Sequence, residues 1–334
     1  MARELDFLYA SARIKALETK LLGRAVMERI LEAEGPEEAL KVLSDTDYGT
    51  DVGEMENVYD FENVLEKSIK RTYRTVKDSV KDKRLVRFFT LKNDYHNLKV
   101  VIKSRIIGTE GKEYFSPLGE ISPEEMQKLA GEDVAAMVPE SIKMAFRKAV
   151  ELYEATQDPQ QVDLLLDRAL FEELSALVED VGDGFLKNYF EAMVDLTNIK
   201  ILGRLMQIKA DVKSLERALL PGGTLSRDLF VRLFNEPMQN VIEALSSTPY
   251  RKVVEEGLTR WANTGSPAAF EKLSDDYLLA LARKGLYKPF GIEPVVGYLA
   301  ARENEVKNLR ILMVGKINGI SSDTIKERLR DVYV

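Results

Sequence analysis

The chain contains no cysteine, one histidine and one tryptophan among its 334 residues. Without cysteine it forms no disulfide and uses no thiolate chemistry, which fits a reducing compartment. The single histidine, His96, is too few for a zinc or di-iron centre, because such centres usually need several His or Cys ligands. We therefore expect no transition-metal site and interpret His96 as an ordinary polar residue just outside the apolar face of its helix.

Nucleotide-binding loops are also missing. Gly108-Thr109-Glu110-Gly111-Lys112 and Gly315-Lys316 both depart from the spacing that cradles phosphate, and no Gly-x-Gly-x-x-Gly occurs. Asp275-Asp276-Tyr277 begins like the acidic cluster of helical prenyl-chain enzymes, but leucines follow where the closing acid is needed. Nothing in the sequence nominates a catalytic constellation, and we predict no cofactor and no enzymatic activity.

Long apolar runs and a basic surplus are absent too. No run approaches the roughly 20 residues that span a bilayer, and the first residues lack the charged and apolar regions of a signal peptide. We therefore expect a cytoplasmic protein, or one held at a membrane by other proteins. The formal net charge of −7 argues against a general nucleic-acid binder, which needs a basic face.

The composition that is present favours an all-helical, soluble chain. Hydrophobic residues make up 45% and charged residues 31%, which is enough for a sizeable core. Glycine and proline are sparse, and valine and isoleucine do not alternate as they do in strands. Helical periodicity begins early and predicts one helix over residues 4–33.

A short motif recurs three times. It reads acid, two variable residues, Asn, Leu or Ile, a base, then two aliphatic residues. The copies are Asp94–Val101, Asp195–Leu202 and Glu305–Leu312. Their Asn residues lie 101 and then 110 positions apart. This spacing predicts three related domains, which we bound at residues 1–110, 111–218 and 219–334.

On a helix, the acid and the Asn of each copy lie at one end of the stripe that becomes apolar core. The three acid and Asn combinations are Asp94 with Asn97, Asp195 with Asn198, and Glu305 with Asn308. Asn inside a helix costs about 0.5 kcal/mol relative to Ala, and a buried acid costs more unless it is paired. We interpret the six residues as structural polar clamps that tie each core helix to a neighbour. The alternative is a three-fold ring of polar groups that meets a partner.

A second repeated pattern occurs in the first and last thirds of the chain. Leu43-Ser44-Asp45-Thr46-Asp47-Tyr48 and Leu245-Ser246-Ser247-Thr248-Pro249-Tyr250 share the pattern Leu-Ser-x-Thr-x-Tyr. Ser and Thr favour helix ends and turns. We interpret both stretches as a helix end followed by a turn.

Four stretches of the sequence together resemble one family. They are Tyr9–Glu18, Asp47-Tyr48-Gly49, Asp94-x-x-Asn97-Leu98-Lys99, and Glu303–Arg310 with Gly315-Lys316. Their order over nearly the whole chain is similar to that of the C subunit of the archaeal and bacterial V/A-type ATP synthase/ATPase, the equivalent of the d subunit of the eukaryotic vacuolar ATPase.

The resemblance implies a funnel of three similar helical bundles around a pseudo-three-fold axis. It also implies a non-catalytic socket, present as one copy per complex and monomeric when isolated. The socket would sit on the cytoplasmic face of the membrane rotor ring of proteolipid subunits and receive the foot of the central stalk. Torque for ATP-coupled proton or sodium transport would pass through it, so the protein would be peripheral to the membrane.

Basic residues in and after the motif are candidate contacts with acidic or carbonyl groups of a partner. Arg310 and Lys316 correspond to the family's closing basic motif. The other candidates are Lys99, Arg105, Lys200 and Arg204. A solvated helix face is the alternative for each one.

A free-standing helical-repeat scaffold that binds soluble protein partners is the alternative function. Its repeats would be unusually long, because solenoid units run about 20–50 residues. An enzyme is a third interpretation, and it would require a site that the sequence does not display.

Overall fold

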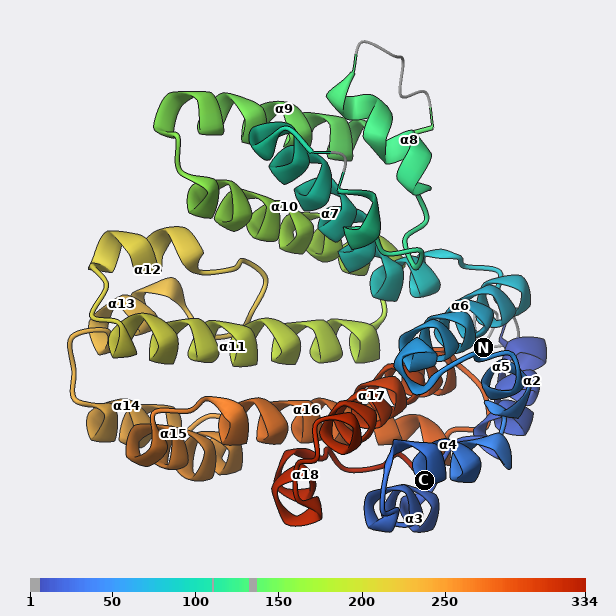
Figure 1. The fold of residues 1–334 in the computed structure, drawn as a ribbon. Helices are drawn as coiled ribbons and strands as arrows, with labels where there is room; N and C mark the ends of the chain where they lie inside the picture. The colour runs from blue at the N-terminus through green and yellow to red at the C-terminus, as the bar shows by residue number, and fades with distance from the viewer. Residues whose placement is uncertain (1–6, 110, 132–136) are drawn as a thin grey trace. The chain divides into compact units, whose positions relative to one another are not determined.

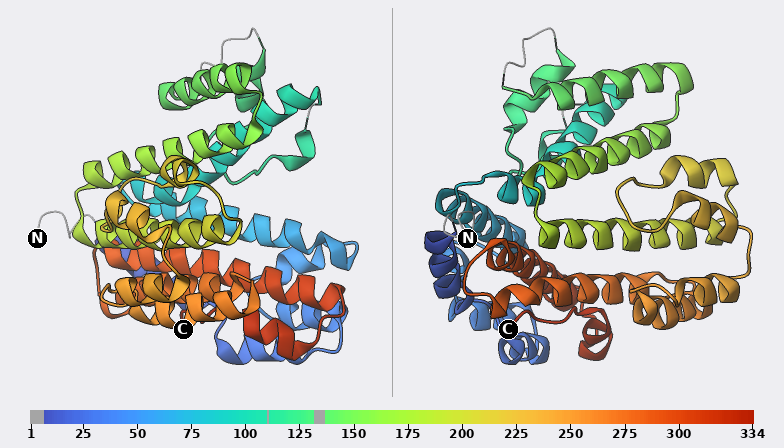
Figure 2. Two further views of the ribbon diagram at one scale, coloured as in Figure 1. Left: turned by 90° about the vertical axis from the view of Figure 1, so that its left-hand side faces the viewer. Right: turned by 180° about the vertical axis from the view of Figure 1, so that it is seen from behind.

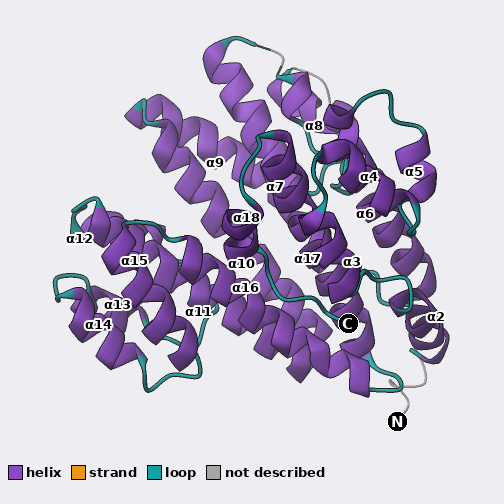
Figure 3. Cartoon of the chain, turned by 60° about the horizontal axis from the view of Figure 1, so that its bottom comes forward, coloured by secondary structure: helices purple, strands orange, loops and turns teal. Residues whose placement is uncertain are grey.

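The computed structural model describes residues 7–109, 111–131 and 137–334. In these ranges all regular structure is helical and no strand occurs, which confirms the all-α prediction (Figure 3). The described chain forms two compact units, and α11 (Gly184–Gln207) and α13 (Arg227–Leu233) contribute residues to both. Within the same ranges, none of the helices is both long and apolar enough to cross a bilayer.

The first unit comprises the described residues up to Lys83, then Leu202–Ile208 and Arg232–Val334. Besides the shared α11 and α13, its longer helices are α2 (Leu8–Glu18), α3 (Arg24–Glu32), α4 (Pro36–Ser44), α6 (Phe61–Ser79), α14 (Met238–Leu245), α16 (Ala268–Ala282) and α17 (Ile292–Ile317). Shorter turns complete it: α5 (Gly49–Gly53), η1 (Val58–Asp60), the π-helical η4 (Val253–Leu258), α15 (Thr259–Thr264), η5 (Arg283–Tyr287) and α18 (Ser322–Arg328).

Helix α17 is the centre of this unit, and it packs against α2, α3, α4, α6, α16 and η5 (Figure 1). Its first half is buried on nearly every side because its residues are apolar or small. Gly297 is one reason for the close packing: a Cβ there would lie 2.8 Å from the Ala282 carbonyl oxygen and 2.5 Å from the Tyr333 hydroxyl. A residue larger than glycine would push α16 or Tyr333 away from α17.

The second unit comprises Arg84–Ile201 and Lys209–Val231. Its own elements are α7 (Arg84–Ile107), η2 (Lys112–Tyr114), α8 (Pro123–Gln127), η3 (Lys128–Ala130), α9 (Glu140–Thr156), α10 (Pro159–Val181) and α12 (Val212–Ala218). Helix α10 packs on α7 and on α9 (green and teal in Figure 2). The core of the second unit contains edge-on and tilted contacts among the rings of Phe88, Phe89, Tyr189 and Phe190.

Local sequence explains where the helices of the second unit begin and end. The Ser122 side chain accepts a hydrogen bond from the Glu125 N–H and caps α8, and Pro123 occupies the first helical position, where no N–H is needed. Asp158 caps α10 in the same way. Gly182 ends α10 with φ +61°, a left-handed conformation that favours glycine.

One element differs from the prediction. A single helix over residues 4–33 is wrong, although residues 4–6 lie outside the described ranges: α2 ends at Glu18 and α3 begins at Arg24. Gly23, extended at ψ 174°, stands before α3. The break frees the Leu22 N–H from helical bonding, and this group binds Glu305 instead. The division into residues 1–110, 111–218 and 219–334 is a different partition from the two compact units, and it stays a prediction.

Candidate functional site

The three copies of the motif lie on α7, α11 and α17, which we call the motif helices. Their acid and Asn side chains are Asp94, Asn97, Asp195, Asn198, Glu305 and Asn308. All six are between 0% and 4% exposed. Polar groups buried to this degree need partners, and each of the six has them.

Each motif Asn binds both backbone groups of one residue further along the chain. Its amide nitrogen donates to that residue's carbonyl oxygen, and its amide oxygen accepts from the same residue's N–H. The distances are 2.9 and 2.8 Å for Asn97 with Ser116, 2.9 and 2.9 Å for Asn198 with Leu220, and 3.0 and 2.9 Å for Asn308 with Arg330. The side chain thus supplies the hydrogen bonds that these non-helical connections cannot make within a helix.

The acids of the first two copies bind backbone N–H groups of the same non-helical connections, a few residues further along the chain. Asp94 Oδ1 accepts from the Ile121 N–H at 3.0 Å, and Asp195 Oδ1 accepts from the Leu225 N–H at 3.0 Å. In both copies this donor stands five positions after the residue bound by Asn. Thr224 adds a hydroxyl donor to Asp195 at 2.5 Å.

A glycine stands three positions after the Asn-bound residue in both connections. A Cβ on Gly119 would lie 2.3 Å from Asp94 Oδ1, and one on Gly223 would lie 2.2 Å from Asp195 Oδ1. The backbone must therefore pass directly over the carboxylate, and only glycine leaves room for it. The repeated glycine shows that the two connections follow the same path over their motif helices.

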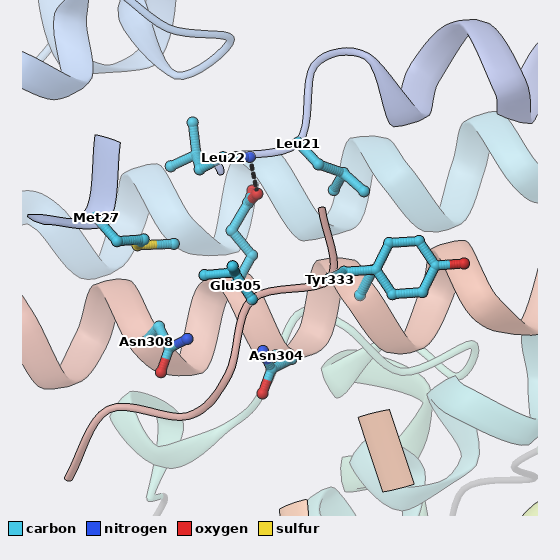
Figure 4. A pocket seen from close by; sticks show the side chains of 9 residues that line it. Leu21, Leu22, Met27, Asn304, Glu305, Asn308 and Tyr333 are labelled. Atoms are coloured by element: carbon cyan, nitrogen blue, oxygen red, sulfur yellow. Dashed lines mark hydrogen bonds between the residues drawn. The ribbon is translucent and has the colours of Figure 1, made fainter. Parts of the chain in front are cut away.

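In the third copy the backbone donor comes from the other end of the sequence. Glu305 Oε2 accepts from the Leu22 N–H at 2.6 Å (Figure 4). Glu305 Oε1 accepts from the Tyr48 hydroxyl at 2.8 Å. Leu22 stands two residues before α3, as Ile121 and Leu225 stand two residues before α8 and α13. The third motif helix, α17, therefore binds the stretch between α2 and α3 in the same way as the first two motif helices bind the connections that follow them.

Glu305 also has a buried cation, Arg302, one turn earlier. Arg302 Nη1 donates to Glu305 Oε1 at 2.5 Å, and its other nitrogens donate to Ser68 Oγ and Thr72 Oγ1 on α6. The guanidinium carbon lies 5.2 Å from the centroid of the Tyr48 ring. Leu91 and Ala192 occupy the equivalent positions in the first two copies, so this buried ion pair belongs to the third copy alone.

Burial sets the electrostatics of these groups. It raises the pKa of Glu305, although Arg302 and the hydrogen bonds from Leu22 and Tyr48 act in the opposite direction. Burial, followed by the charge of Glu305, also raises the pKa of Tyr48 well above its usual value. In the first copy, burial raises the pKa of Asp94 to about 6, against the lowering effects of the Ile121 amide and Arg87.

Sequence reasoning did not anticipate Leu22, Tyr48 and Arg302 at this site. The pattern around Tyr48 predicts a helix end with a turn, and Thr46 does bind the Leu43 carbonyl oxygen at 2.7 Å, as Thr248 binds that of Leu245 at 2.6 Å. The signal that could have identified Tyr48 is its repetition in a second third of the chain. The longer acid of the third copy, Glu in place of Asp, was a further signal, because it reaches more distant donors.

The candidate contact cations have varied surroundings. Lys99 binds Asp167 at 2.7 Å, Arg204 binds Glu271 at 2.9 Å, and Arg310 binds both carboxylate oxygens of Glu62 at 2.7 and 2.9 Å. Lys316 donates to the carbonyl oxygens of Leu31 and Ala33, both at 2.6 Å, at the end of α3. Arg105 is exposed and Lys200 half-buried. Contact with a partner stays a prediction for all six.

The acidic stretch on α16 holds the C-terminal segment. Asp275 accepts from Lys307 and Arg330, each at 2.9 Å, and Asp276 accepts from the Asp331 N–H at 2.7 Å. Over the described parts of the chain, no group of three or more His, Cys, Asp or Glu side chains is arranged to hold a metal ion. The acid and Asn side chains of the motif helices are thus hydrogen-bonded to other segments of the chain, and their role as structural clamps stays a prediction.

Comparisons with known proteins agree along the whole chain. A family model described as "ATP synthase (C/AC39) subunit" matches residues 10–328. The C subunit of the A-type ATP synthase of Methanocaldococcus jannaschii is 27% identical over 97% of this chain and 86% of its own length. The C subunit of the V-type sodium ATPase of Enterococcus hirae is 26% identical over 96% and 97%. The C subunit of the A-type ATP synthase of Methanothermobacter thermautotrophicus is 29% identical over 97% and 87%.

Proposed function

Because the chain belongs to the ATP synthase (C/AC39) subunit family, and is thus a non-catalytic subunit of a rotary ATPase, we propose that it is the socket of that machine. It joins the central stalk of the soluble head to the proteolipid ring in the membrane. Torque passes through it between ATP chemistry in the head and proton or sodium movement across the membrane.

The observation that carries this proposal is the tie between each motif helix and a connection that crosses it. In the first two copies, three or more hydrogen bonds hold the connection from a buried acid and a buried Asn. A torque coupler must resist shear between its helices, and reactive side chains are of no use to it. Buried hydrogen-bonded networks provide that resistance, because each unmade bond leaves a costly unsatisfied group.

The order of these ties supports three similar bundles in a funnel with a pseudo-three-fold axis. Asn97 in residues 1–110 binds Ser116 in residues 111–218, and Asn198 in that second third binds Leu220 in residues 219–334. Glu305 in the last third binds Leu22 in the first. Each third therefore reaches into the next and the last reaches into the first, which is the cyclic order that a three-fold arrangement requires.

The partners in this proposal are the ring on one side and the stalk subunits on the other. One copy serves each complex, and the isolated protein is a monomer. It lies on the cytoplasmic face of the membrane and is held there by the complex. Among the candidate contact cations, the exposed Arg105 is the best placed to reach a partner, whereas Lys316 is occupied by the carbonyl oxygens that end α3.

The test is a binding experiment with purified components. The protein is mixed with the detergent-solubilised ring and, separately, with the central-stalk subcomplex, and each mixture is followed by analytical ultracentrifugation. We expect one copy to bind each partner. Failure to bind either one, by a protein with a normal helical circular dichroism spectrum, would overturn the socket and favour a free-standing helical scaffold.

A charge reversal then tests the contact residue. Arg105→Glu should weaken binding to one of the two partners and leave the other unaffected. Lys148→Glu, a charge reversal at an exposed position of α9, is the control. Equal behaviour of the two variants would contradict the role of Arg105.

A further inference from the structure

The link between α16 and α17 differs in composition from the chain as a whole. Residues 283–290 read Arg-Lys-Gly-Leu-Tyr-Lys-Pro-Phe, with three cations and no acid in a chain of net charge −7. Tyr287 is 86% exposed and Phe290 is 40% exposed. Lys284 and Lys288 are exposed beside them. We call residues 283–290 the basic-aromatic loop.

The loop is held firmly at its base. Lys15 on α2 donates to the carbonyl oxygens of Gly285 and Leu286 at 3.1 and 2.9 Å, and the Arg283 guanidinium donates to the Val332 carbonyl oxygen. Gly285 lies against the start of α17, where a Cβ would be 2.3 Å from the Glu293 carbonyl oxygen. The exposed rings are therefore presented by a fixed backbone, and little conformational entropy is lost when they meet a partner.

Two other exposed tyrosines stand beside an acid. Tyr59, 72% exposed, lies next to Asp60, and Tyr114, 65% exposed, follows Glu113. At the basic-aromatic loop the Glu293 carboxylate is 4.0 Å from Lys288 Nζ. The exposed rings thus stand in a segment with three cations and no acid of its own, and this local excess of positive charge favours an anionic surface as the partner of the loop.

We propose that the basic-aromatic loop binds an anionic lipid surface directly. Aromatic rings prefer the interfacial region of a bilayer, where Tyr keeps its hydroxyl in the headgroup layer. Lysines next to them keep their ammonium groups at the lipid phosphates, and their stems lie along the apolar boundary. The loop adds a contact with lipid to the protein contacts proposed above, and it does not depend on them.

Vesicle co-sedimentation of the full chain tests the proposal without ring or stalk. The vesicles contain phosphatidylglycerol and phosphatidylcholine in equal parts, or phosphatidylcholine alone. We expect binding to the mixed vesicles only, and binding that weakens as salt is raised because the attraction is screened. Lys284→Gln with Lys288→Gln should lower the partition coefficient by about five-fold for each lysine. Tyr287→Ser with Phe290→Ser should lower it by about ten-fold.

Matched controls separate the loop from general effects of charge and apolar surface. Lys213→Gln with Lys252→Gln removes the same charge from two exposed helix positions, and Tyr59→Ser with Tyr114→Ser removes two other exposed rings. Both controls should bind vesicles as the unmodified chain does. Equal binding to the two kinds of vesicle, no binding to either, or equal loss in the loop variants and their controls would overturn the proposal. Because ring and stalk binding are measured separately, failure here leaves the socket untouched.

Discussion

Replacing Asn198 with leucine isolates one polar clamp. Asn198 is 3% exposed and makes two hydrogen bonds of 2.9 Å to the backbone of Leu220, which is itself 8% exposed. Leucine has a similar size but neither a donor nor an acceptor, so it leaves a buried N–H and a buried C=O without partners. Each such group costs about 1–3 kcal/mol. We therefore expect the free energy of unfolding to fall by about 2–5 kcal/mol.

Two measurements locate the loss. Hydrogen exchange at the Leu220 amide reports the clamp itself, and the amide should lose protection in the variant. Urea unfolding followed by circular dichroism gives the free energy, while fluorescence of Trp261 reports the first unit separately. Thr197→Ala is the control, because the Thr197 hydroxyl binds only the Met193 carbonyl oxygen of its own helix. It should change the unfolding free energy by no more than about 0.5 kcal/mol.

A comparison with the third copy sharpens the test. The hydrogen bonds between Asn308 and Arg330 are only partly buried, whereas those between Asn198 and Leu220 are buried, so water can replace part of what Asn308→Leu removes. The loss there should be smaller, about 1–2 kcal/mol. An Asn198→Leu variant that keeps its stability and its Leu220 protection but no longer binds the ring or the stalk would contradict the clamp. Asn198 would then act by contact with a partner.

Three further substitutions test the surroundings of the clamps. Burial raises the pKa of Asp94 to about 6, so the folded state holds this proton more tightly than the unfolded chain does. The unfolding free energy of the unmodified chain, compared with that of Asp94→Asn, should therefore fall by about 1–3 kcal/mol as pH rises from about 4 to 6. Urea unfolding across this range measures the difference, and Ile102→Val is the control, whose effect should not depend on pH. A difference between the unmodified chain and Asp94→Asn that stays constant with pH would contradict this expectation. Gly223→Ala puts a Cβ 2.2 Å from the Asp195 carboxylate and should cost about 1–3 kcal/mol in thermal unfolding; an unchanged melting temperature would show that the connection can move aside. Arg302→Met leaves the Glu305 carboxylate buried without its cation, so the free energy of unfolding should fall by about 3–5 kcal/mol at neutral pH. The loss should be smaller at acidic pH, where Glu305 is protonated. A loss that does not depend on pH would show that the unpaired carboxylate is not its cause.

Helical periodicity was enough to predict which side chains of the motif share a face. Asp94 and Asn97 stand three positions apart, and this offset alone places them on one stripe of any α-helix. The apolar residues that continue the stripe indicate that it faces the core, and the structure buries both side chains completely. Such inferences succeed because they depend on contacts within a single turn.

The partners of Glu305 could not be inferred in this way. Tyr48 and Leu22 lie 257 and 283 positions away, and periodicity within a helix carries no information on which distant segment packs against it. The break between α2 and α3 escaped prediction for the same reason, because its amide is stabilised by a carboxylate from α17. Apolar spacing alone continues the helix through Leu21 and Leu22.

Lys316 illustrates a second limit of sequence reasoning. Its place near the end of α17 and its long charged side chain are typical of a solvent-facing residue. Its ammonium group nevertheless reaches the last carbonyl oxygens of α3 and satisfies groups that a helix end leaves unbonded. A long side chain can bury its stem and find a partner several ångströms from its own helix, and this reach is set by tertiary packing.

The hydrogen bond from Leu22 to Glu305 has a consequence for synthesis of the protein. At about 5–20 residues per second, a ribosome needs roughly 15–60 s to translate the 283 residues that separate them. Helices α2–α6 thus emerge first and receive their central helix, α17, last. During that interval the surfaces that these helices pack against α17 have no partner, whereas α7 is followed by its partners α8, α9 and α10 after far fewer residues. The nascent N-terminal segment is therefore the part of this protein with the greatest need for a chaperone.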